Sequence, residues 1–176
     1  MGGDQGPQAI LHGAARAALD YPTLELLLFG PGRQLSAELS RLPQPLAAAA
    51  SRMVVCDARG SVAQEASAAW ALRHGQDSSM AGMLRSVGGH GMHGSVDAGV
   101  SAGNTAALVA LSRRELGTLP GIGRPAISTA LPTRNGHRCY LLDLGANIDP
   151  PAHRLVDFAV MGAAMAQSID AIERPR

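Results

Sequence analysis

Three short polar segments carry the residues best suited to chemistry in this 176-residue sequence. They are Ser78-Ser79, Ser101–Thr105 and Asp143–Asn147, and each places hydroxyl, amide or carboxylate side chains beside small residues. Where such a segment opens a helix, unpaired N–H groups and roughly half a positive charge make a ready anion site. Serine, threonine and asparagine are also ordinary helix caps, so one such segment is weak evidence. Three together indicate a site for a phosphate-sized anion.

The elements that must position these segments alternate between apolar strands and helices. The pattern predicts strands at residues 24–30, 52–58, 96–102, 125–133 and 138–147. It predicts a helix that begins at Asn104 and others at residues 7–20, 33–42, 62–75, 77–87 and 151–169. Apolar strands separated by helices are typical of a parallel sheet covered on both faces. We therefore expect a single α/β domain over residues 1–176, a three-layer α/β/α sandwich with a mostly parallel sheet.

Composition excludes several classes of function. The formal net charge is +1 and only five residues are aromatic, so we expect no nucleic-acid partner. All fifteen basic residues are arginine, which removes every mechanism that needs a lysine of this chain. No apolar run approaches the ~20 residues of a membrane span, and no signal peptide is evident. These features favour the cytoplasm.

Cysteine and histidine add little chemistry. Cys56 and Cys139 lie in apolar runs, and we expect reduced thiols rather than a disulfide. His90 and His93 have a spacing that some metal sites use, but they lack an adjacent carboxylate or cysteine ligand. We therefore expect no metal and no cofactor.

Six motifs in order resemble those of a known family. They are MGGDQGP at 1–7, DSSM at 77–80, VSAGNTAAL at 100–108, LPGIGRPAISTALPT at 119–133, LLDLGANID at 141–149 and FAVMG at 158–162. The chain resembles the N-terminal half of the bacterial acyl-ACP phosphate acyltransferases, the PlsX family. The resemblance implies an incomplete Rossmann-like α/β/α fold related to isocitrate dehydrogenases and phosphotransacetylases. It also implies an enzyme that forms acyl phosphate from acyl-ACP and inorganic phosphate in phospholipid synthesis.

The resemblance also implies partners and site residues. It implies a cytoplasmic homodimer, peripheral at the membrane in the full-length family, with a downstream membrane acyltransferase as a further partner. The catalytic residues it indicates are Asp4, Ser101 and Asn104. The substrate- and phosphate-binding residues it indicates are Gly2, Gly3, Ser78, Ser79, Gly103, Thr105, Asp143, Gly145 and Asn147. Because ligands of doubly wound sheets bind beyond the carboxyl ends of the strands, segments 1–4, 101–105 and 143–147 should converge on one cleft.

The reaction suits a site of this kind. Inorganic phosphate, like a phosphate monoester, is partly dianionic near neutral pH, so it needs no strong base to act as a nucleophile. The enzyme must hold the anion against the thioester carbonyl and stabilise the oxyanion that forms. Helix starts that bear hydroxyl and amide groups can do this without a lysine or a catalytic triad.

Departures from the family leave two other functions open. The chain is shorter than family members, and it begins at Met1, whereas family members have a strand before this motif. Ala106 lies where the family usually has glycine, and residues 88–95 lie where the family has the charged end of a helix. One alternative is an inactive fragment that serves as a binding or dimerisation module. The other is a phosphotransacetylase-like enzyme acting on acyl-CoA. We expect the chain alone to be unstable and inactive, because a sheet edge and the apolar helix 155–169 lose their cover.

Overall fold

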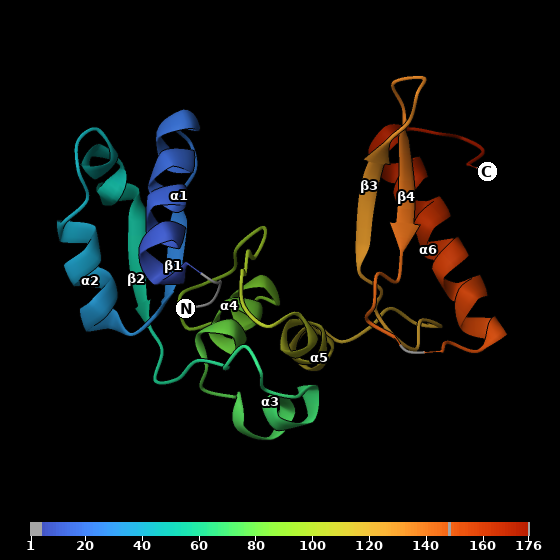
Figure 1. Ribbon diagram of the computed structural model, residues 1–176, viewed down its shortest axis with the longest axis horizontal. Coiled ribbons are helices and arrows are strands. Elements are labelled where there is room, and N and C mark those ends of the chain that lie inside the picture. Colours follow the sequence, from blue (N-terminus) through green and yellow to red (C-terminus); the bar gives the residue numbers. More distant parts are fainter. Residues whose placement is uncertain (1–4, 148, 176) are drawn as a thin grey trace. The chain divides into compact units, whose positions relative to one another are not determined.

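The computed structural model describes residues 5–147 and 149–175. The chain divides into two compact units, Met1–Gly117 and Thr118–Arg176, here called the first and second units. Figure 1 traces the order of the elements within each unit. The single domain expected over residues 1–176 stays a prediction.

The first unit opens with a parallel strand pair and the crossover that joins its strands. Its elements are α1 (Gly6–Asp20), β1 (Leu26–Gly30), α2 (Gly32–Ser40), the 3₁₀ helix η1 (Leu46–Arg52) and β2 (Met53–Asp57). The strands pair in parallel from Leu26↔Met53 to Gly30↔Asp57, so both carboxyl ends lie at one edge. The helices α1 and α2 and the strands β1 and β2 form where the sequence predicts them. A proline in the first turn of α1 favours the start of that helix.

The two faces of this strand pair pack against different cores, because successive side chains of a strand point to opposite faces. On one face Leu26, Leu28 and Val55 pack against a cluster formed with α1 and α2: Leu11, Ala15, Leu35, Leu42 and Met53. On the other face Phe29 packs against the helices that follow β2. Helices therefore contribute to both faces of the strand pair.

Three helices build the rest of the first unit: α3 (Ala68–His74), α4 (Ser79–Val87) and α5 (Thr105–Leu116). Their core is the cluster Val62, Ala71, Met80, Ala81, Met83, Leu84, Ala107 and Leu111. The helix predicted from residue 62 begins only at Ala68, because Ser67 caps it by accepting the Trp70 N–H at 3.1 Å.

The strand predicted at residues 96–102 does not form, and that prediction is wrong. Residues 88–104, all of them described, contain no strand, and Val100 is 94% exposed. The Val96 N–H donates to the Ser86 carbonyl at 3.1 Å, so the end of α4 holds this segment. An apolar segment forms a strand only where an adjacent strand pairs with its backbone N–H and C=O groups. Here the end of α4 accepts a backbone hydrogen bond from the segment instead.

The second unit is a hairpin with one helix beside it. Strands β3 (Ser128–Pro132) and β4 (Arg138–Leu142) pair antiparallel, and α6 (Ala152–Asp170) runs along them (Figure 1). Both strands lie within the predicted ranges, but their pairing is antiparallel where we expected a mostly parallel sheet. The physical reason is the short connection at 133–137, because a parallel pair needs a crossover of a dozen or more residues.

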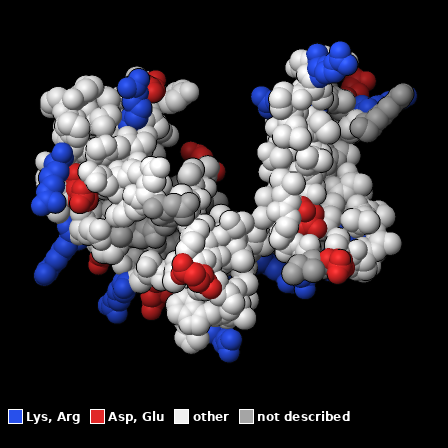
Figure 2. Space-filling view, viewed as in Figure 1, with Lys and Arg blue, Asp and Glu red and all other residues white. Residues whose placement is uncertain are grey.

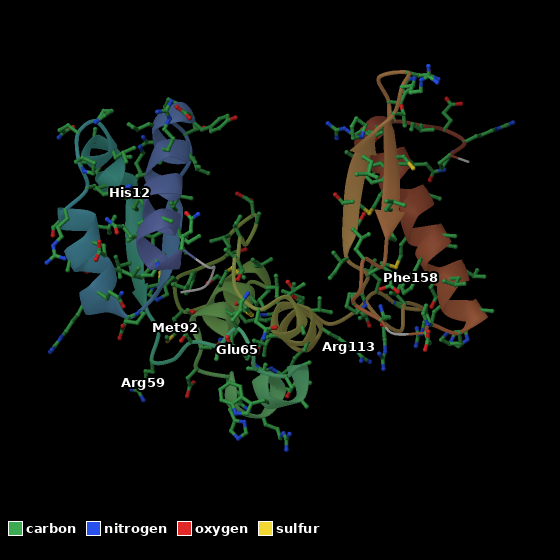
Figure 3. The ribbon with its side chains drawn as sticks, viewed as in Figure 1. His12, Arg59, Glu65, Met92, Arg113 and Phe158 are labelled. Atoms are coloured by element: carbon green, nitrogen blue, oxygen red, sulfur yellow. The ribbon has the colours of Figure 1, made fainter. Side chains whose placement is uncertain are left out.

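A glycine sets the distance between α6 and the hairpin. A Cβ on Gly162 would lie 3.0 Å from Leu142 Cδ1, so the missing side chain permits close packing. Phe158 of the same helix is buried (Figure 3). By contrast, Leu155, Val156 and Val160 are 56, 63 and 59% exposed.

Helices combined with a parallel strand pair make this an α/β protein, as predicted, with a small Rossmann-like arrangement in the first unit. Among the described residues, β1 and β2 form the parallel strand pair, and an isolated parallel bridge joins Gly60 to Ser78. Within that same part of the chain, no helix is both long and apolar enough to span a membrane.

Candidate functional site

A cleft of about 510 Å³ opens in the first unit at the carboxyl edge of its parallel strands. It is lined from β1, from the residues after β2, from α4 and from the segment after α4. The lining residues are Phe29, Asp57, Ala58, Arg59, Asp77, Ser78, Gly82, Arg85, Ser86, His90, Gly91, Met92 and His93. Ligands of open α/β sheets bind at this edge, so the cleft is the candidate site.

Asp57 is the last residue of β2, lines the cleft and contacts the start of α2. Its Oδ1 accepts the Gly32 N–H at 2.7 Å, at the start of α2. A carboxylate is favourable there because the helix start carries partial positive charge. A Cβ on Gly32 would lie only 3.0 Å from the same oxygen, so glycine permits this contact.

Ser78 forms the start of α4 and lines the cleft, as its sequence position predicts. Its hydroxyl accepts the Ala81 N–H at 3.2 Å and donates to the Gly75 carbonyl at 2.6 Å. The Ser79 N–H donates to the Gly60 carbonyl at 2.9 Å, which ties the helix start to the segment after β2. Ser78 therefore acts as a helix cap in the wall of the cleft, and its binding role stays a prediction.

Charged side chains of both signs reach the cleft. The cleft is lined by two arginines, Arg59 and Arg85, and by two carboxylates, those of Asp57 and Asp77. Arg85 Nη1 also lies 3.9 Å from Glu115 Oε1. Arg85 is held in place by the Gln76 carbonyl, which accepts from its Nη1 at 2.9 Å. Figure 2 shows charged groups scattered singly over a mostly uncharged face, without a field of one sign. Recognition of a charged ligand therefore depends on the local groups of the cleft.

Asn104 begins α5, as predicted, and its side chain is committed to the backbone. Oδ1 accepts the Ala107 N–H at 2.9 Å. Nδ2 donates to the carbonyls of Ala63, Gln64 and Ala66 at 3.2, 2.8 and 2.7 Å. The residue is only 6% exposed. Its amide thus joins the start of α5 to a turn some forty residues earlier in the chain.

The neighbours of Asn104 are more open. The Ser101 hydroxyl is partly buried and accepts the Gly103 N–H at 3.2 Å. Thr105 is exposed in the first turn of α5. The expected strand-to-helix corner is therefore a loop-to-helix corner, and none of these residues lines the cleft.

The 143–147 segment lies in the second unit and closes on itself. Asp143 Oδ1 accepts from Asn147 Nδ2 at 2.7 Å and from the Asn147 N–H at 3.1 Å. Gly145 has a φ of 84°, a conformation that favours glycine. These bonds shape a tight turn after β4, and the binding role of the three residues stays a prediction.

Only some of the predicted site residues lie at the cleft. Ser78 lines the cleft and Ser79 lies beside it at the start of α4, whereas segment 101–105 starts a different helix of the same unit. Gly2, Gly3 and Asp4 lie outside the described residues. Convergence of segments 1–4, 101–105 and 143–147 therefore stays a prediction.

Sequence reasoning missed most of the residues that line the cleft. Asp57 and Arg59 could have been found, because they end or follow a predicted strand at the edge where ligands bind. His90 and His93 were considered only as metal ligands. Among the described residues, no group of three or more His, Cys, Asp or Glu side chains is arranged to hold a metal ion.

Two groups outside the cleft lining have a raised pKa. Burial raises the pKa of the Cys56 thiol, which keeps it protonated. Burial, followed by the neighbouring Asp170, raises the pKa of the Tyr140 hydroxyl. Cys56 is thus a packed core residue rather than an activated nucleophile.

The whole chain is similar to known proteins. The family model described as "Fatty acid synthesis protein" matches residues 1–176. The phosphate acyltransferase of Pseudoalteromonas atlantica is 40% identical over 176 residues, which is 100% of this chain and 50% of that protein. That of Photobacterium profundum is 44% identical over 167 residues, 95% of this chain and 47% of that protein. That of Stutzerimonas stutzeri is 45% identical over 169 residues, 96% of this chain and 45% of that protein. The chain spans about half the length of the curated relatives it matches.

Proposed function

Because this chain belongs to the fatty acid synthesis protein family, we propose that it carries part of a phosphate acyltransferase. The reaction makes acyl phosphate from acyl-ACP and inorganic phosphate, as a step of phospholipid synthesis. The observation that carries the proposal is the 40–45% identity with phosphate acyltransferases over nearly the whole chain. The polar cleft at the carboxyl edge of β1 and β2 supports it, because this edge is where such folds bind ligands.

The chemistry asks for positioning and charge stabilisation. A phosphate oxygen attacks the carbonyl carbon of the thioester, and negative charge develops on the carbonyl oxygen. Collapse of this intermediate breaks the C–S bond, and the leaving thiolate takes up a proton. Because the nucleophile is already anionic, the protein contributes chiefly by holding the two reactants together and by stabilising the oxyanion.

The described side chains divide this work as follows. Arg59, Arg85 and the start of α4 hold the phosphate in the cleft, with Ser78 keeping the helix start in place. The proposal also requires Ser101, Thr105 and the first N–H groups of α5 to come within reach of the cleft, since they would meet the carbonyl oxygen of the acyl group although none of them lines the cleft. Asn104 is a positioning residue, because its amide is committed to backbone partners on both sides. We assign Asp4 a catalytic role on the basis of its sequence motif alone.

Assembly and location belong to the same proposal. The protein works as a homodimer in the cytoplasm, at or near the membrane surface, and delivers acyl phosphate to a membrane acyltransferase. The exposed apolar side chains of α6, among them Leu155 and Val160, support a contact surface on the second unit.

The test is an acyltransfer assay with radiolabelled inorganic phosphate and acyl-ACP. Two preparations are compared: residues 1–176 alone, and the protein expressed with whatever in-frame sequence flanks it in the genome. We expect labelled acyl phosphate, trapped by hydroxylamine as the hydroxamate, from the second preparation and little from the first. Preference for acyl-CoA would indicate the phosphotransacetylase-like alternative. Binding of acyl-ACP with no product from either preparation would indicate a binding module.

A further inference from the structure

The Gly88–Gly94 segment, here called the strap, forms one wall of the cleft and is anchored near both of its ends. Its residues in the cleft lining are His90, Gly91, Met92 and His93. At the start of the strap, the Gly88 N–H donates to the Leu84 carbonyl at 2.9 Å. Just beyond its end, the Val96 N–H donates to the Ser86 carbonyl at 3.1 Å. Both anchors lie on α4, so the strap leaves this helix and returns to it.

Two glycines lie between these anchors and flank the middle of the strap. Gly89 and Gly94 have φ values of 77° and 86°, a region that other residues rarely adopt. A Cβ added to either glycine would meet no atom within 4 Å, so the structure does not hold these positions by packing. Both positions therefore have the conformational freedom that a hinge needs.

Few contacts hold the middle of the strap against the cleft. The His90 N–H donates to the Arg85 carbonyl at 2.9 Å, and the His93 ring meets Phe29 edge-on with the ring centroids 6.1 Å apart. Both histidines are exposed, and Met92 is 94% exposed (Figure 3). A segment with so few buried apolar contacts opens at a low cost in free energy.

The closed position of the strap also has an unfavourable contribution, which comes from Ser86. This residue is 0% exposed, and its Oγ makes no hydrogen bond with any described residue. Gly91 packs directly onto it, because a Cβ on Gly91 would overlap the Ser86 hydroxyl and backbone. A buried hydroxyl without a partner is unfavourable, whereas water can bind it once Gly91 moves away. Contacts of the two histidines therefore favour the closed strap, and the Ser86 hydroxyl favours the open one.

We propose that residues 90–93 form a gate, which opens by rotation at Gly89 and Gly94 and closes through the edge contact of His93 with Phe29. Opening removes one wall of the cleft and admits a ligand, and closure excludes water from the bound ligand. The gate itself rests on the contacts of the strap. That the cleft behind it is the place of acyl transfer rests on the proposed function.

The first test measures how fast a thiol beneath the strap reacts with a disulfide reagent. Ser86→Cys introduces this thiol into the chain expressed with its flanking in-frame sequence, and Cys139→Ser removes the exposed cysteine. Cys56 is the matched reference, because Cys56 and Ser86 are both 0% exposed. We expect the introduced thiol to react at least about tenfold faster than Cys56, since only a local opening is needed. Low concentrations of denaturant should not change its rate, because opening the gate exposes little surface.

Substitutions within the strap test the contact that closes the gate. His93→Ala removes the edge contact and should make the introduced thiol react several-fold faster. His93→Phe keeps an aromatic ring at the same position and should restore the slower rate. Met92→Ala is the matched control, because this side chain belongs to the same strap but is almost fully exposed, and it should leave the rate unchanged.

Hydrogen exchange tests the gate without the introduced thiol. The His90 amide is protected by the Arg85 carbonyl only while the gate is closed. Ser86→Ala should slow the exchange of this amide several-fold, because the closed strap then no longer buries an unpaired hydroxyl. Exchange resolved to single amides provides the measurement.

Three outcomes overturn the gate. The first is an introduced thiol that reacts as slowly as Cys56 and with the same dependence on denaturant. The second is an equal effect of His93→Ala and Met92→Ala, and the third is unchanged or faster exchange of the His90 amide in Ser86→Ala. The proposed function fails separately, because a gate that opens in a protein forming no acyl phosphate leaves the gate in place and removes the reaction.

Discussion

The two units of the molecule differ in how completely they cover their apolar side chains. The first unit has two buried clusters, in which Leu11 and Leu111 are 2 and 0% exposed. Among the described residues of the second unit, only Phe158 and Ala166 are buried apolar residues. A hairpin packed against one helix buries one face only, and a lone hairpin is marginal in water. The comparison teaches that stability resides mainly in the first unit.

Strand pairing is the origin of this difference. The parallel strands of the first unit require a crossover, and that crossover supplies α2 and η1 as cover for one face. The antiparallel strands of the second unit need only a turn, so their connection brings no helix. The second unit also buries the Ser128 and Tyr140 hydroxyls without a partner among the described residues. Ser86 of the first unit is likewise a buried hydroxyl without a partner among the described residues, so the contrast between the units lies in how they cover their apolar side chains.

Core truncation should give the largest contrast between the units. Leu111→Ala removes a fully buried side chain of the first unit and should lower its free energy of unfolding by ~2–5 kcal/mol. Leu155→Ala, at a position 56% exposed in α6, should change stability by at most ~0.5 kcal/mol. Hydrogen exchange with peptide resolution measures each unit separately. Equal losses of protection for the two variants would contradict the comparison.

Loss of the Asn104 side chain should have the next largest effect. Asn104→Ala removes a helix cap and leaves partly buried carbonyls without their donor, for a cost of about 1–2 kcal/mol to the first unit. Asn104→Asp keeps the oxygen that caps α5 but loses the N–H groups that donate to the carbonyls. It should therefore recover only part of the lost free energy of unfolding. Thermal unfolding measures both. Unchanged stability combined with much slower acyl phosphate formation would instead make Asn104 the catalytic residue expected from its motif.

Two glycine substitutions should give smaller effects of opposite sign. Gly145→Ala in the second unit forces a side chain onto a φ of 84° and should destabilise by about 1 kcal/mol. Gly13→Ala lies in α1 of the first unit, where an added Cβ meets no atom within 4 Å, and should stabilise by about 0.4–1 kcal/mol. Melting temperatures of the pair provide the measurement. Destabilisation by Gly13→Ala would show that α1 is not the regular helix described.

The reactivity of the two cysteine thiols reports how well each unit shields its interior, and it needs no substitution. Cys139 on β4 is exposed and should react promptly with a disulfide reagent. Cys56 on β2 is buried, and burial raises its thiol pKa, so it should react slowly and faster only at higher pH or on unfolding. Counting modified thiols over time checks this. Rapid modification of Cys56 at neutral pH would show that the first unit opens readily.

Local signals in the sequence predicted the elements better than their pairing. Pro7 and Ser78 occur where helices begin, because a helix start is decided by its own few residues. Residues 96–102 have the composition of a strand, yet they form a loop held by the end of α4. Whether an apolar run becomes a strand, and which neighbour it pairs with, depends on residues distant in the sequence.

The candidate site divides in the same way. Ser78 could be predicted because capping and anion binding use the same local chemistry. His90 could not, because it follows α4 and reaches the cleft at the end of β2 only through the tertiary fold. The cap that Asn104 forms was predicted, but the three carbonyls that its amide also reaches could not be, because they lie some forty residues earlier in the chain.

The sequence by itself determined the family, the α/β class and the starts of the helices, because motifs, apolar patterning and caps involve residues close together in the chain. Only the tertiary structure decided that the later strands pair antiparallel, that Asn104 serves the backbone, and that the unpartnered Ser86 hydroxyl lies under Gly91. These features are contacts between separate segments. Their free energy depends on distance and burial, which the order of residues does not state.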